Sequence, residues 1–182
     1  MWAQSFNERY LSQRRVRDLA WRMLSHHARP HTVSQWTHLS ERRIRTLLEN
    51  YGPRGVEVTR PRGRAPYKID ALLMSPRNRH ETGLFLQQGL PAGILNGKRS
   101  SHPFFCIERG ETICGAFESL ETLHPSIEMR LESALLISET LFFTEDYVCL
   151  RCRQCQQISM LESPIVTPRC IDCGRFIQEQ PL

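Results

Sequence analysis

Apolar residues recur at helical spacing over most of the chain, and this period predicts a mainly α-helical fold. The first helix is expected over residues 7–28, with Asn7 as its cap and Pro30 as the residue that ends the segment. Its buried face would consist of Val16, Leu19, Ala20, Met23 and Leu24.

Two later stretches repeat the helical period. Residues 67–90 predict one or two helices, for which Ser75-Pro76 is a start signal. Residues 116–138 predict two more, divided at Pro125-Ser126. Leu131, Ala134, Leu135 and Ile137 should be buried in the second of these.

Between the first helix and residue 67, the pattern predicts a helix-turn-helix at about residues 32–50. Its expected parts are Thr32 as a cap, a helix over 33–37, a turn at His38 and Leu39, Ser40 as a second cap, and a helix over 41–50. The apolar residues that would pack the two helices together are Val33, Trp36, Leu39, Ile44, Leu47 and Leu48.

The second helix of this pair would expose Glu41, Arg42, Arg43, Arg45 and Thr46. Because the N-terminal turns of such a helix enter a major groove, Arg42, Arg43 and Thr46 are candidates for base or phosphate contact. An ordinary helical hairpin with a solvated charged face would give the same pattern. The basic loop over 52–66 could follow a phosphate backbone or a minor groove, and a merely solvated loop would have the same composition. Its arginines are Arg54, Arg60, Arg62 and Arg64.

The basic charge is concentrated towards the N-terminus. Residues 1–110 hold 19 Lys and Arg against 8 Asp and Glu, whereas residues 111–182 hold 5 against 11. All basic residues except Lys68 and Lys98 are arginines, whose planar donors suit phosphates and guanine edges. This distribution indicates a basic surface for a polyanion such as nucleic acid.

Five of the seven cysteines lie near the C-terminus as C-x-x-C-x-x-C and, after 14 residues, C-x-x-C-G. Two C-x-x-C pairs at this separation are typical of a tetrahedral zinc site. The preferred ligands are Cys152, Cys155, Cys170 and Cys173, with Ile158 beneath the first pair and Gly174 ending the second turn. A set that begins with Cys149 and Cys152 is the alternative. Four thiolates leave no open position for water, so one structural Zn²⁺ is expected.

These patterns divide the chain into a helical DNA-binding domain over 1–140 and a zinc-binding lobe over 141–182. The composition, 40% hydrophobic and 24% charged, suffices for a packed core. No signal peptide, membrane-spanning stretch or motif of a known catalytic site is recognisable, so we expect a cytoplasmic protein that is not an enzyme and has no membrane partner.

Three stretches together resemble the FlhC family of bacterial transcriptional activators. They are the segment from Leu39 to Leu47, which is similar to the family's LS-x-x-R-[LI] element, the Ser75 to Phe85 region after a basic loop, and the paired C-x-x-C motifs. The resemblance implies a DNA-binding subunit that joins an FlhD-like partner in a hetero-oligomer, binds promoter DNA and recruits RNA polymerase. The operons would be flagellar or conjugative-transfer operons.

By position, the resemblance also implies which residues act. The zinc ligands would again be Cys152, Cys155, Cys170 and Cys173, with Cys149 as an additional thiol. DNA contact would fall to Arg42, Arg43, Arg45, Arg60, Arg62 and Arg64. Two other classes of function remain open from the sequence: a zinc-ribbon RNA-binding protein and a zinc-stabilised adaptor for protein interactions.

Overall fold

The computed structural model describes residues 2–51, 66, 68–95, 105–163 and 168–177, with the backbone alone at 2–9 and 51. Within these residues the chain is mainly helical, as the sequence predicts. The elements are α1 (Trp2–Ser25), α2 (Pro30–Thr37), α3 (Glu41–Tyr51), α4 (Ile69–Leu73), α5 (Pro76–Ala92), α6 (Ile107–Leu123), α7 (Leu131–Phe143), β1 (Tyr147–Arg151) and β2 (Ile158–Glu162). The strands pair antiparallel, with Cys149 opposite Met160.

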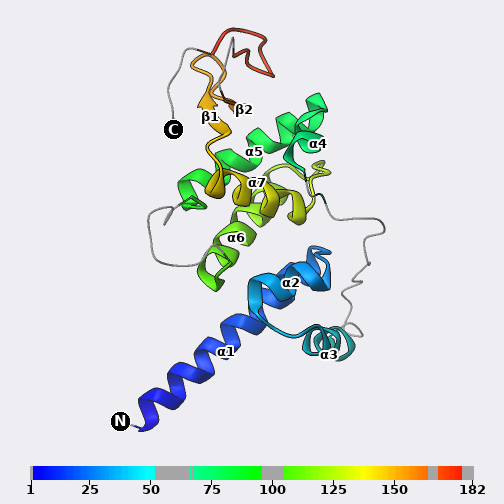
Figure 1. Cartoon of the computed structure of the whole chain (residues 1–182), viewed down its shortest axis with the longest axis vertical. Coiled ribbons are helices and arrows are strands. Elements are labelled where there is room, and N and C mark those ends of the chain that lie inside the picture. Colours follow the sequence, from blue (N-terminus) through cyan, green and yellow to red (C-terminus); the bar gives the residue numbers. More distant parts are fainter. Residues whose placement is uncertain (1, 52–65, 67, 96–104, 164–167, 178–182) are drawn as a thin grey trace.

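The helices form an elongated body with the strands at one end (Figure 1). The N-terminal half of α1 projects from the other end, and α2 and α3 lie beside its C-terminal half. The central core joins α1, α2, α5, α6 and α7. Its largest fully buried side chains include Leu19, Met23, Trp36, Phe85, Phe117 and Leu131.

The helix pair predicted for residues 32–50 is present as α2 and α3. His38 ends α2 in the left-handed conformation, with φ 55°. The Ser40 hydroxyl accepts a hydrogen bond from the Arg43 N–H at 3.5 Å, as expected of a cap. Ile44 is fully buried, so α3 packs by its apolar face. DNA contact by this pair stays a prediction.

Three predicted helix boundaries near the N-terminus are wrong. The first helix begins at Trp2, so Asn7 lies within it and is not its cap. The first helix ends at Ser25, three residues earlier than expected, and Pro30 begins α2 because a proline needs no hydrogen-bonded N–H in a first turn. The cap of α2 is therefore Arg29, not Thr32. The carboxylate that serves this N-terminus comes from α7: Glu132 accepts from the Arg29 N–H at 3.0 Å and from the Thr32 hydroxyl at 3.2 Å.

The later helices follow the sequence pattern more closely. Ser75 caps α5 by accepting from the Asn78 N–H. The predicted division at Pro125-Ser126 falls between α6 and α7, although α6 begins at Ile107, well before residue 116. All four residues expected to be buried in the second helix are buried in the core.

Among the described residues, no helix combines the length and the apolar character that crossing a bilayer requires.

Candidate metal centre and basic helix

Four cysteines meet at the C-terminal end of the molecule. The sulfur atoms of Cys152, Cys155, Cys170 and Cys173 all lie within 4.8 Å of one another. The Sγ atoms are 3.6 Å apart for Cys152 and Cys173, and 3.4 Å apart for Cys155 and Cys170. Tetrahedral zinc with Zn–S bonds of about 2.3 Å sets its sulfurs about 3.8 Å apart, so this cluster fits a metal ion such as zinc.

Each C-x-x-C pair is held in the same backbone turn, here called a knuckle. In the first knuckle, residues 152–157, the Cys152 N–H donates to the Gln157 C=O at 2.9 Å and the Gln156 N–H to the Cys152 C=O at 2.8 Å. In the second, residues 170–175, Cys170 makes the matching bonds with Arg175 and Gly174, at 2.8 and 2.9 Å.

Both knuckles end in the left-handed region, at φ 65° for Gln156 and φ 69° for Gly174. The glycine was predicted from the sequence, because glycine adopts this conformation at little cost. Gln156 was missed. Its only signal is its place, since it follows the first C-x-x-C as Gly174 follows the second.

Backbone donors point at the sulfurs. The N–H groups of Cys155 and Gln154 donate to the Cys152 sulfur and lower the pKa of that thiol to about 7. In the second knuckle, burial raises the pKa of Cys170, while the N–H groups of Cys173 and Asp172 donate to its sulfur and oppose that rise. Such donors stabilise thiolates, which are the form that binds a metal.

Cys149 lies outside the cluster. It is on β1, packed against the main core, and its burial raises the pKa of its thiol to about 12. Burial also raises the pKa of Cys114 to about 12. Both side chains therefore have the surroundings of plain core cysteines. The structure brings together the preferred four-cysteine set and not the alternative that begins with Cys149.

We call the two strands and the two knuckles together the metal-site lobe. Polar contacts that the sequence does not predict join this lobe to α5. The Gln157 side chain donates to the His80 C=O at 3.2 Å and accepts from Gln87 at 2.8 Å. His80 Nδ1 lies 2.8 Å from the Asp172 carboxylate, inside the second knuckle. Ile158, expected beneath the first knuckle, belongs instead to the core of the helical body.

The exposed residues of α3 divide between two faces. Glu41, Arg42, Arg43, Arg45 and Thr46 are all exposed, as predicted. Arg43 and Thr46 face α1, whereas Arg42 and Arg45 do not line that side. The Thr46 hydroxyl donates to the Arg42 C=O at 3.1 Å, so it is engaged within the helix.

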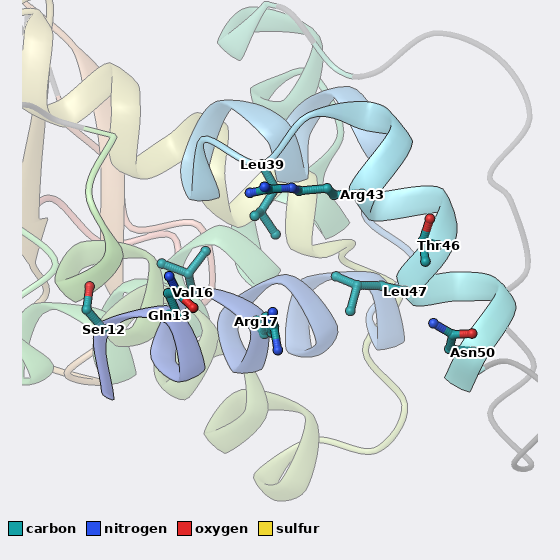
Figure 2. A pocket seen from close by; sticks show the side chains of 9 residues that line it. All are labelled: Ser12, Gln13, Val16, Arg17, Leu39, Arg43, Thr46, Leu47 and Asn50. Atoms are coloured by element: carbon teal, nitrogen blue, oxygen red, sulfur yellow. The ribbon is translucent and has the colours of Figure 1, made fainter. Parts of the chain in front are cut away.

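A groove of about 550 Å³ separates α1 from α3. Figure 2 shows the side chains that line it, on the facing sides of the two helices. They are Ser12, Gln13, Val16 and Arg17 from α1, Leu39 from the turn, and Arg43, Thr46, Leu47 and Asn50 from α3. The groove is thus partly apolar with a guanidinium group from each helix.

Several arginines of residues 1–110 form ion pairs with glutamates of the same molecule. Arg22 donates to Glu118 twice, at 2.8 and 2.7 Å, and Arg15 contacts Glu108 and Glu111. Arg29 pairs with Glu132. Arg77 pairs with Glu81 and Glu128. The separation of charge along the sequence thus serves partly to join the two parts of the fold.

The arginines of α3 differ from these in their ion pairing. Over the described ranges, no carboxylate lies within ion-pair distance of Arg42, Arg43 or Arg45, and the same holds for Arg17 on α1. The predicted contacts Arg54, Arg60, Arg62 and Arg64 lie outside the described residues.

No family model matches this chain, and no curated protein matches it either.

Proposed function

We propose that this chain is a DNA-binding subunit of a transcriptional activator, in which α3 contacts duplex DNA and a zinc-bound lobe stabilises the other end. The resemblance to the FlhC family supports this reading. So does the tight turn that leads from α2 into α3, because the stretch from Leu39 to Leu47 that carries part of the resemblance covers this turn and most of α3.

The observation that carries the proposal is the contrast between two sets of arginines. Those of α1 and α5 that pair with glutamates hold the fold together. Those of α3 face solvent beside a helix N-terminus, with no described carboxylate to neutralise them. Guanidinium groups that fold stability does not require are suited to phosphates and to base edges.

Zinc is the proposed metal, held by Cys152, Cys155, Cys170 and Cys173. Four thiolates complete its shell, so its contribution would be to fold the lobe, and no catalytic step is part of the proposal.

An FlhD-like subunit and RNA polymerase are the proposed protein partners, at flagellar or conjugative-transfer operons. The projecting half of α1 leaves Tyr10 and Leu11 exposed, at 59% and 49% of their surface. Exposed apolar residues on an isolated helix are suited to a second subunit, because such a helix gains stability when its apolar face is packed.

The test replaces two exposed arginines of α3. The variant with Arg42→Ala and Arg45→Ala should bind a mixed-sequence DNA duplex about tenfold more weakly or worse, and its binding should depend less steeply on salt. Fluorescence anisotropy over a salt series measures both, and metal content should be unchanged.

The control is Arg79→Ala, which removes a solvent-exposed arginine from α5 and should bind the duplex like the wild type. Equal loss in the control would mean that net charge alone matters. A wild-type chain without salt-sensitive binding to any duplex would contradict the proposal and favour the adaptor function.

A further inference from the structure

An aromatic side chain faces solvent beside the metal centre. Phe176 keeps 59% of its surface exposed, whereas the next residue, Ile177, is only 4% exposed. Successive side chains of extended chain point to opposite faces, so burial of Ile177 in the lobe's small core directs Phe176 outward.

Local structure fixes the direction of this ring. Arg169 and Phe176 form an isolated antiparallel bridge at the two ends of the second knuckle. The Arg169 guanidinium lies over the ring, 4.4 Å from its centre. This cation–π contact covers one face of the ring and leaves the side chain largely accessible.

Further hydrogen-bond donors lie around the Phe176 ring. A hollow of about 280 Å³ is lined by Cys152, Arg153, Gln154, Arg175 and Phe176, which brings both knuckles to one surface. Arg175 donates to the Gln154 side chain at 2.6 Å and so bridges the knuckles. We call Arg153, Arg169, Arg175 and Phe176 the knuckle face.

The knuckle face is basic, although the C-terminal part as a whole is acidic. Between residues 147 and 177 the sequence holds four arginines and two carboxylates. Of these carboxylates, Asp172 is bonded to His80 and Glu162 lies at the end of β2. Arginines could offset the negative charge of a thiolate cluster, but that need would not place an exposed ring among them.

We infer that the knuckle face binds single-stranded nucleic acid, with Phe176 stacking on an unpaired base and the arginines contacting the flanking phosphates. An exposed ring among guanidinium groups is the combination that single-strand binders use, because every base has a face that can stack. Paired bases in a duplex do not offer that face. Base stacking and phosphate contact do not depend on the sugar, so DNA and RNA strands should bind alike.

This site is separate from the proposed duplex contact. The lobe lies at the end of the molecule away from α3 (Figure 1). The inference therefore does not depend on the function proposed for α3, and the two can fail independently.

The experiment measures binding of oligothymidine and oligouridine to the full chain by fluorescence anisotropy. Phe176→Ala should weaken binding of both strands about 5- to 150-fold, the loss expected for one stacked base. Phe176→Trp should retain binding, because indole stacks at least as well. Binding of the mixed-sequence duplex should change little in either variant.

Phe143→Ala is the matched control. Phe143 is also 59% exposed but lies on α7, and its removal should leave strand binding unchanged. Metal content and the thermal midpoint of Phe176→Ala should match the wild type, which separates lost stacking from a damaged lobe.

Three results would overturn the inference: equal strand binding by Phe176→Ala and wild type, equal losses in Phe176→Ala and Phe143→Ala, or binding of one kind of strand alone. Loss of strand binding in the variant with Arg42→Ala and Arg45→Ala, together with intact binding in Phe176→Ala, would place single-strand contact on α3 instead.

Discussion

At the scale of single residues, one ionic network joins the N-terminal helix to the middle of the chain. Glu118 on α6 accepts from Arg22 on α1, and His26 Nε2 lies 3.3 Å from the same carboxylate. Burial alone would raise the pKa of Glu118, but the hydrogen bonds from Arg22 and His26 outweigh it and hold that pKa below its ordinary value of 4.5. The ionised carboxylate therefore stabilises the fold.

Glu118→Gln should lower the free energy of unfolding at neutral pH by about 1 kcal/mol, a modest value because water screens a carboxylate that is 37% exposed. A lowered pKa gives stability that is complete above the ordinary value and is lost as the pH falls through the folded-state value. Denaturant unfolding at several pH values should show the difference from wild type shrinking below about pH 4.5. Glu145→Gln, at an exposed position, should show no such difference. If the difference in unfolding free energy between Glu118→Gln and wild type persists in acid, the charge of Glu118 is not what stabilises the fold.

At the scale of elements, close approach of α5 and β2 sets the position of the metal-site lobe. A Cβ atom on Gly83 would lie 2.2 Å from the Ile158 C=O oxygen and 2.4 Å from the Gln157 side chain. Only a residue without a side chain allows this contact. Gln157 directly precedes β2, so the close approach at Gly83 also keeps its side chain in reach of α5, where it contacts His80 and Gln87.

Gly83→Ala should destabilise the protein by about 1–3 kcal/mol, because the new methyl group collides with backbone that has little freedom to move. The matched control is Gly115→Ala in α6, where the nearest atom to the new Cβ would be Arg22 Nη2 at 3.7 Å. That change should be neutral or stabilise by up to about 1 kcal/mol, since alanine favours a helix over glycine. Thermal unfolding followed by circular dichroism compares the stabilities of the two variants. Equal changes in Gly83→Ala and Gly115→Ala would refute the packing argument.

The helices also show which features of the fold can be predicted from the sequence. The helical period predicts α2, and period together with a local cap predicts α3 and α5, because those signals lie within a few residues of each helix. The start of α2 was missed because its cap comes from Glu132, more than a hundred positions away on α7. The exposed position of Phe176 has no local signal in the sequence for a similar reason: it depends on the bridge that the folded lobe makes with Arg169.

At the scale of the whole molecule, the cysteine spacing predicted which thiols gather, because each C-x-x-C closes a local turn. The sequence did not show that this lobe is joined to the helical body. Ile158 and Met160 of β2 are buried in the main core, while Leu150, Cys152, Cys170 and Ile177 form a small second core. A metal that stabilises the second core should therefore also stabilise the contact with α5.

Cys152→Ser should lose bound zinc and lower the thermal midpoint of the whole chain, with a loss of several kcal/mol in unfolding free energy. Cys149→Ser should keep a full complement of zinc, since that thiol lies outside the cluster. A colorimetric zinc assay and thermal unfolding would be read together. Full zinc content in Cys152→Ser, or its loss in Cys149→Ser alone, would show that the ligand set is different.

The pairing of Arg15, Arg22 and Arg29 with glutamates of α6 and α7 has a consequence for dissecting the protein. A truncated fragment that ends after α3 would release these three guanidinium groups from their partners. It would then adhere to heparin or any other polyanion more strongly than the intact chain does. Binding measurements on such fragments would overstate the affinity of the N-terminal helices for polyanions, because these arginines are paired with glutamates in the intact chain.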